Sequence, residues 1–426
     1  MEQLNSPSYI KKIASVGDKE KILAANDIYS ITGIKLIGQG SHINTQLYQK
    51  ILSHKLAKPI DESLTMENCI TTDKILDKIY ILAEENILAR EIFETNSNKQ
   101  FVSRIIKSVK IPKALQFRLN ILDITMEETV NHCLLVALTA IYIAYKLNMD
   151  TSKIVKLAYA AIFLDIGLLH LNQEIFSKTT QLSSDERKQI FSHPIIAALI
   201  MKSYVNDQEI CLSIMDHHER ADGSGYPKGK LIEDISTNGQ ILGIAELAVT
   251  LSQSPGKYSY KSRIQSILKF NSEQYEKTIL LILLELISTF ETPESEYSIN
   301  NNTDNEVSKA HFVNTLLKLW SAINNYNQDN SENNIVSDFI LNQLFILKHN
   351  LNMSGLSMDI FTMDNEDIDE ILHESEEVHA LVDEAFYKLK SIVQEVKRRW
   401  FDKITSTNSC SNINEWLSQV DNIINE

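Results

Sequence analysis

The sequence predicts a mainly α-helical protein with more than one folded unit. Its 426 residues exceed one ordinary domain of roughly 100–200 residues, so two or three units are expected. Only 12 glycines and 7 prolines occur, where an average usage of roughly 12% for the pair would give more than twice as many. This deficit disfavours a turn-rich β-sandwich or barrel, and apolar residues at 3.6-residue spacing favour long helices.

The acidic net charge of −15 limits the partners of the chain. Phosphate backbones repel such a protein, so DNA and RNA are not expected to bind it. None of the four cysteines forms a CxxC pair, which is typical of a reducing cytoplasm and indicates neither a zinc ribbon nor a disulfide framework. No signal peptide is apparent, and the most apolar run, Ile279–Ile287, is far shorter than the about 20 residues of a membrane span. We therefore expect a cytoplasmic protein without a membrane span.

Composition and periodicity divide the chain into four expected segments. These are a small β-hairpin and helix module at 1–67, a helical lead-in at 68–124, a unit rich in unusual polar residues at 125–290, and an acidic helical region at 308–426. In the first, Gly33 is expected to turn between two short strands and Asn44 to cap the following helix. Pro112 marks a break in the second. A polar, Asn-rich linker at 291–307 precedes the last.

One pair of polar residues and one single carboxylate in the third segment suggest metal ligands. Glu128 and His132 lie one helical turn apart, in a helix expected to begin with Thr125 as its N-cap, so both can hold one cation. A structural Glu–His pair on the surface is the alternative. Asp165 is expected to end a nearly all-apolar helix that starts near Thr151. A buried carboxylate there needs a metal ion or a Lys or Arg partner, because the helix dipole disfavours it.

The remaining candidates lie further along the same segment. His193 precedes Pro194 at an expected helix start, where a lone His is a ligand, a cap or a packed side chain. His217 and His218 end the next helix and point about 100° apart, which suits two metals, or one metal and a substrate. Residues 222–229 hold three of the 12 glycines and predict a tight loop. Glu246 follows on a mostly apolar helix. Together these ligands suit Fe, Mn or Zn, and two such metals suit phosphodiester hydrolysis.

In order and spacing these residues resemble the HD-GYP domain, the helical branch of the HD superfamily that hydrolyses cyclic di-GMP. The matching pieces are Glu128 and His132, Leu164-Asp165-Ile166-Gly167, His193-Pro194, the highly specific His217-His218-Glu219-Arg220 with Asp222-Gly223-Ser224-Gly225-Tyr226-Pro227, and Ile244-Ala245-Glu246. The resemblance covers about residues 125–290, and residues 23–66 resemble a module common before such domains. It implies an HD-superfamily helical bundle for this unit.

The resemblance also implies roles for individual residues. Asp165 would be the catalytic residue that bridges metals. The implied metal ligands are Glu128, His132, Asp165, His193, His217, His218 and Glu246. Gly223, Gly225 and Tyr226 would shape the substrate site, and Lys257 or Arg263 would contact phosphate unless they are solvated surface charges. One or two divalent transition metals per chain, Fe or Mn, would be the cofactor, and cyclic di-GMP or a related nucleotide the substrate.

Three positions depart from the family pattern. Leu164 stands where the family has an imidazole ligand, and Leu168 stands where it has a lysine. Glu246 replaces an aspartate and reaches one methylene further. His170 either replaces the lost ligand or is an ordinary exposed histidine. Two functions therefore compete: a weakened metal-dependent phosphodiesterase, or an inactive domain that binds a nucleotide or a protein partner.

Residues 376–402 predict one long amphipathic helix. Its apolar stripe includes Leu381, Leu389, Val396 and Trp400, which share one face. Acidic residues at its start and basic residues at 397–399 suit the helix dipole. The stripe must be buried, either on helices of the same chain or in a homodimer.

Overall fold

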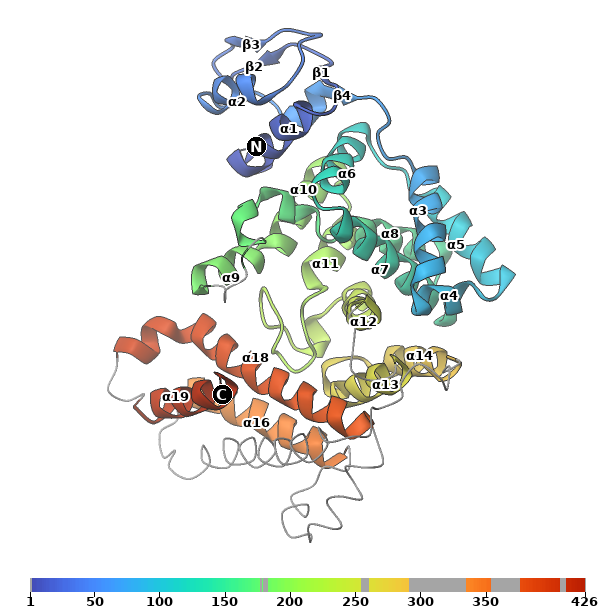
Figure 1. Cartoon of the computed structure of the whole chain (residues 1–426), viewed down its shortest axis with the longest axis vertical. Coiled ribbons are helices and arrows are strands. Elements are labelled where there is room, and N and C mark those ends of the chain that lie inside the picture. The colour runs from blue at the N-terminus through green and yellow to red at the C-terminus, as the bar shows by residue number, and fades with distance from the viewer. Residues whose placement is uncertain are drawn as a thin grey trace, which may run out of the picture. The chain divides into compact units, whose positions relative to one another are not determined.

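The computed structural model describes residues 2–176, 178, 183–253, 260–290, 335–353, 376–406 and 411–425. The chain divides into two compact units. Figure 1 labels most of their helices and strands. The first comprises residues 1–220 and 225–253, and the second comprises residues 221–224 and 254–426. The expected segment 125–290 thus contributes to both units. The four predicted segment boundaries stay predictions, and the predicted linker at 291–307 lies outside the described residues.

The N-terminal module contains two small antiparallel sheets. Its elements are η1 (Glu2–Asn5), α1 (Pro7–Gly17), β1 (Ile22–Ala24), β2 (Ile28–Tyr29), β3 (Lys35–Ile37), α2 (Thr45–Leu52), η2 (Ile60–Ser63) and β4 (Leu64–Met66). The predicted hairpin is confirmed: β2 pairs with β3, and Gly33 lies between them with φ of 82°. The predicted cap is also confirmed, because the Asn44 side chain accepts a hydrogen bond from the Leu47 amide. Helix α1 and the pairing of β1 with β4 were not predicted.

The rest of the first unit is helical. Its elements are α3 (Thr72–Glu85), α4 (Ile87–Phe93), α5 (Asn96–Ser108), α6 (Lys113–Thr125), α7 (Glu127–Lys146), α8 (Thr151–Ile162), η3 (Ile166–His170), η4 (Gln173–Ile175), α9 (Ser184–Ile190), α10 (His193–Tyr204), α11 (Gln208–Asp216), η5 (Ile232–Asp234) and α12 (Thr237–Gln253). Helix α7 packs against α8 and α12 at the centre of this unit. Among the described helices, only α7 is long and apolar enough to cross a membrane, and 72% of its most apolar window is buried inside the protein. It is therefore well suited to be a core helix.

Two predicted helix ends are wrong. Thr125 does not cap α7 but is the last residue of α6, where its hydroxyl donates to the Ile121 carbonyl. Asp165 does not end α8, which stops at Ile162; it lies in the turn before η3. The turn frees its carboxylate from the negative end of the helix dipole, so the predicted conflict with the dipole is smaller.

Apart from the loop residues 221–224, the regular elements of the second unit among its described residues are all helices. They are α13 (Tyr260–Phe270), η6 (Ser272–Gln274), α14 (Lys277–Ser288), α16 (Ile335–Met353), α18 (Glu376–Ser406) and α19 (Ser411–Asn425). The predicted long helix is confirmed in α18, although Trp400 has non-helical dihedral angles and marks a kink. Helix α18 packs against α13, α16 and α19, and Ala385, Leu389 and Val396 are fully buried. The described part of its apolar stripe is thus covered within the chain.

Candidate metal centre

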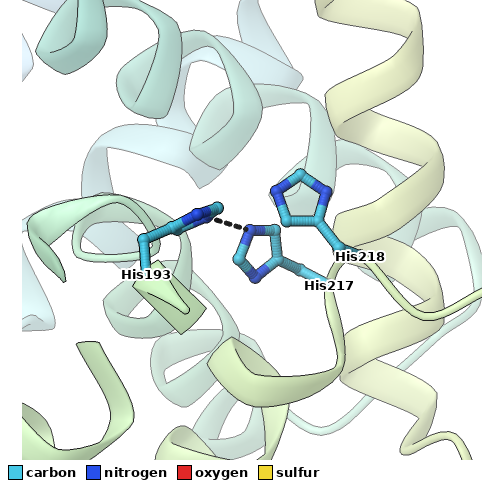
Figure 2. A group of neighbouring side chains, drawn as sticks. All are labelled: His193, His217 and His218. Carbon is cyan, nitrogen blue, oxygen red and sulfur yellow. Dashed lines mark hydrogen bonds between the residues drawn. The ribbon is translucent and has the colours of Figure 1, made fainter. Parts of the chain in front are cut away.

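Three imidazoles converge in the first unit. His193 is the first residue of α10, His217 follows the last residue of α11, and His218 comes next. Each offers one nitrogen, and these nitrogens all lie within 4.8 Å of one another. Figure 2 shows the three rings turned toward one another, with the Nε2 atoms of His193 and His217 3.4 Å apart. The separation suits nitrogens that share one cation.

Backbone carbonyls set the orientation of two of these rings. His193 Nδ1 lies 2.7 Å from the Ile190 carbonyl, and His217 Nδ1 lies 2.5 Å from the Ile214 carbonyl. Because a carbonyl only accepts, each Nδ1 carries a hydrogen, and each ring turns its Nε2 toward the cluster. Metal-ligating histidines are commonly held in this way. Burial, followed by the neighbouring His193, lowers the pKa of His217 to about 3, so its Nε2 is available as a ligand.

Asp165 faces the same cluster. Its Oδ1 lies 3.1 Å from His193 Nε2. Burial acts to raise the pKa of Asp165, but its hydrogen bond with His193 and the nearby imidazoles outweigh burial and hold the pKa at about 2. His193 Nε2 therefore lies between an ionised carboxylate and a neutral imidazole nitrogen. A positive charge, either a proton or a metal ion, is required among these three atoms.

Glu246 supplies a second buried carboxylate from α12. Its Oε2 lies 3.3 Å from His218 Nδ1. The geometry of this contact is not that of a hydrogen bond, and Oε2 has no hydrogen-bond partner among the described residues. Burial raises the pKa of Glu246 to about 8, and burial, followed by His217, lowers that of His218 well below its ordinary value. An unsatisfied carboxylate oxygen beside imidazoles is the environment that a divalent cation would complete.

The other two predicted ligands lie differently. His132 is half-buried on α7, its Nδ1 is 2.8 Å from Gln253 Oε1, and it lies close enough to influence the pKa values of Asp165 and His218. Glu128, one turn earlier, is exposed and makes no hydrogen bond or ion pair with the described residues. The structure thus gathers Asp165, His193, His217, His218 and Glu246, with His132 close by and Glu128 on the surface.

The two leucines that depart from the family pattern are buried. Leu164 is fully buried and Leu168 is 9% exposed. His170 does not replace the missing ligand, because its Nε2 lies 2.7 Å from Arg118. Nor is it the ordinary exposed histidine of the alternative prediction. Burial, followed by the charge of Arg118, lowers the pKa of His170 to about 3. Both predictions for His170 were wrong because its partner is the buried Arg118, and no local sequence pattern indicates that pairing.

The predicted substrate residues form part of a compact loop. Tyr226 stacks on His218, with ring centroids 4.4 Å apart, and on Phe191, with centroids 4.1 Å apart. Gly223 is buried with φ of 74°, and Gly225 packs tightly against residues 218–220. Lys257 lies outside the described residues. Arg263 lies in α13, but its side chain lies outside the described part.

Two residues at the site were not predicted. The Cys133 thiol, buried on α7, donates to Asp165 Oδ2 at 3.7 Å. Phe191 covers Tyr226. In the sequence, Cys133 is indistinguishable from the other apolar positions of a core helix. Phe191 lies two positions before His193 and belongs to no recognised motif. Only the packing of α7 and α10 against the Asp165 turn and the loop reveals either residue.

A known family model matches the part of the chain that carries most of these residues. The HD domain family model matches residues 93–278. The chain is 28% identical over 161 residues to the cyclic di-GMP phosphodiesterase PdeB of Borreliella burgdorferi, covering 37% of this chain and 42% of that protein. It is 29% identical over 135 residues to the 3'3'-cGAMP-specific phosphodiesterase 1 of Vibrio cholerae, covering 32% of this chain and 31% of that protein.

These matches span less than half of each relative. A solved HDG"Y"P protein from Bdellovibrio bacteriovorus is 16% identical and aligns with 64% of this chain and 98% of its own, at a TM-score of 0.35.

Proposed function

We propose that the chain carries an HD domain of the HD-GYP kind, and that this domain is a metal-dependent phosphodiesterase that opens cyclic di-GMP or a closely related cyclic dinucleotide. The observation that carries the proposal is the convergence of the Nε2 atoms of His193 and His217 with the ionised carboxylate of Asp165. Relatives of two substrate specificities support the substrate class, and the reducing cytoplasm is its proposed location.

The proposed ligands divide into inner and outer groups. Asp165, His193 and His217 would hold the metal directly, and His218 and Glu246 would complete the site or hold a second ion. His132 and the exposed Glu128 would join only from the first turns of α7. These nitrogen and oxygen donors suit Fe or Mn, one or two ions per chain. A bound ion would act as a Lewis acid toward the phosphoryl oxygens.

The chain's own residues would orient the substrate. Carbonyls of Ile190 and Ile214 fix the imidazole rings, so the ligand atoms need little rearrangement to act. Tyr226, stacked between its two neighbours, would wall the site from solvent together with Gly225. The predicted substrate contacts of Gly223, Lys257 and Arg263 stay predictions.

The alternative is a domain that has lost hydrolysis. The observation in its favour is that Leu164 and Leu168, in place of an imidazole and a lysine, are both buried. Such a domain would keep the histidine cluster and bind a nucleotide or a protein partner without turning it over.

Elemental analysis after anaerobic purification tests the metal site. We expect Fe or Mn at fewer than three ions per chain. His217→Gln should lower Mn²⁺ affinity at least tenfold, because it removes a ligand nitrogen. The matched control His54→Ala changes an exposed histidine and should bind as the wild type does. A protein that is purified without metal and takes up neither Mn²⁺ nor Fe²⁺ would refute the proposal.

Cyclic di-GMP turnover in Mn²⁺ or Fe²⁺ then separates the two functions. The double variant Leu164→His, Leu168→Lys restores the family's side chains and should raise turnover. Burying the new imidazole without a metal costs about 1–3 kcal/mol, so the variant is measured with metal present. A folded, metal-loaded double variant with no gain would favour the inactive domain.

A further inference from the structure

The loop after His218 crosses from one compact unit to the other and back. The chain leaves the first unit after Arg220, contributes residues 221–224 to the second, and returns at Gly225. We call residues 221–224 the loop tip. Its two flanks belong to the metal centre: His218 precedes it, and Tyr226, stacked on His218, follows it.

The two flanks are pinned to each other within the first unit. The Tyr226 amide donates to the His218 carbonyl at 3.1 Å. A Cβ on Gly225 would lie 2.5 Å from that same carbonyl oxygen and 2.4 Å from the Arg220 backbone nitrogen. The backbone before the loop tip is therefore in direct contact with the backbone after it. The Glu219 carboxylate also accepts from the Lys228 and Lys230 amides, at 2.7 and 2.8 Å. A displacement of the loop tip therefore acts at once on His218 and Tyr226.

Helices of the second unit hold the loop tip. The Asp222 side chain is 1% exposed, and its Oδ2 lies 3.1 Å from Lys388 Nζ on α18. Gln274 donates to the same oxygen at 3.2 Å. Gln343 on α16 donates to the Asp222 carbonyl at 3.2 Å, and Arg399 on α18 donates to the Gly223 carbonyl at 2.8 Å. These partners therefore bind two backbone carbonyls of the loop tip and its single carboxylate.

We propose that Lys388 is a positioning residue of the metal centre: through Asp222 it holds the loop tip, and thereby places Tyr226 against His218. The Lys388 side chain is only 8% exposed, so neither charge of the pair is compensated by water. Without the lysine, the carboxylate must leave its buried place, and the loop tip leaves with it. The C-terminal helices then control the shape of the site through the loop tip. The link to turnover rests on the proposed function, whereas the link to loop order does not.

Hydrogen exchange on the full chain tests the positioning role. Lys388→Met should speed exchange of the amides of residues 221–226 at least tenfold and weaken Co²⁺ binding at the histidines about threefold to tenfold. Lys388→Arg keeps the charge and should restore both values. The control Lys390→Met lies on the same helix, where Lys390 makes no hydrogen bond or ion pair with the described residues, and it should match the wild type.

A second variant guards against loss of the C-terminal fold. Asp222→Asn removes the charge from the loop side and leaves α18 untouched, so it should reproduce the faster exchange with unchanged helix content. Wild-type exchange at residues 221–226 in folded Lys388→Met and in Asp222→Asn would overturn the proposal. Cyclic di-GMP turnover is measured in parallel. A shift in exchange in a protein without turnover keeps the positioning role and refutes only the proposed function.

Discussion

The two segments that lead away from the metal centre are held by similar chemistry but by different parts of the chain. After Asp165, the chain enters η3; after His218, it enters the loop tip. Each is held by a buried cation paired with a carboxylate and by donors to backbone carbonyls. At η3 every partner belongs to the first unit, whereas at the loop tip the partners belong to the second.

The η3 side is anchored by Arg118, which is fully buried. Its Nε lies 2.6 Å from Asp61, and its other nitrogens reach His170 at 2.7 Å and the Leu4 carbonyl at 2.9 Å. Lys12 Nζ donates to the Leu169 and Leu171 carbonyls at 3.1 and 3.0 Å. Lys12 of the N-terminal module thus fixes the end of η3, the element that directly follows Asp165. One half of the site is therefore tied to the stability of its own unit, while the other half depends on a separate unit.

The largest expected effect breaks the C-terminal side. Leu389→Asp places an unpaired charge at a fully buried position of α18 and should destabilise the second unit by roughly 5 kcal/mol. Thermal unfolding followed by circular dichroism should show early loss of part of the helix signal, with the first unit still folded. Tyr387→Asp, at a side chain that is 68% exposed, is the control and should change little.

The same variant addresses the predicted homodimer. Because the described stripe of α18 packs within the chain, light scattering should give the same mass for wild type and variant. A dimeric wild type that becomes monomeric on substitution would instead support the homodimer.

Next in size is the anchor of η3. Arg118→Met leaves Asp61 buried without a cation and should cost about 3–5 kcal/mol of the free energy of unfolding, measured in urea. Adding Asp61→Leu removes the stranded charge, so the double variant should regain part of the loss. A loss below about 1 kcal/mol for the single variant would show that the pair is not the anchor we infer.

A smaller but more local effect is expected at Gly167. An added Cβ would lie 2.2 Å from the His193 carbonyl oxygen, so Gly167→Ala must push η3 away from the start of α10. Such overpacking costs about 1–3 kcal/mol. It should also separate Asp165 from His193 and weaken Mn²⁺ binding, measured by calorimetry. Wild-type metal affinity in this variant would mean that the site tolerates the shift.

The smallest expected effect is a change in pH dependence. The pKa of His170 is about 3 in the folded chain, below its ordinary value of 6.5. The unfolded chain therefore binds a proton that the folded chain does not, and stability is full above pH 6.5 and falls as the pH is lowered toward 3. Between pH 7.5 and 5.5 this group should remove about 1 kcal/mol, from 1.36 kcal/mol per pKa unit. His170→Gln keeps an acceptor for Arg118 and should lose that part of the slope in urea titrations.

Local sequence was enough to predict much of the framework. The low Gly and Pro content and the apolar periodicity predicted the helices, Gly33 predicted the hairpin turn, and Pro194 predicted that His193 begins a helix. The family motif predicted the set of residues from which the histidine cluster is drawn. These features depend on dihedral preferences and on hydrogen bonds between residues a few positions apart, which a short stretch of sequence determines by itself.

What the sequence could not determine is which distant groups meet. The approach of His193 Nε2 to His217 Nε2, the burial of His170 beside Arg118, and the exposure of Glu128 follow from how the helices pack. Lys388 and Asp222 are 166 positions apart, and no local pattern links them. A buried charge is stable only where its partner is also buried, and that condition is met by the packing of whole helices rather than by neighbours in sequence. The tertiary structure alone therefore decided how the histidine cluster and its flanking loop are held.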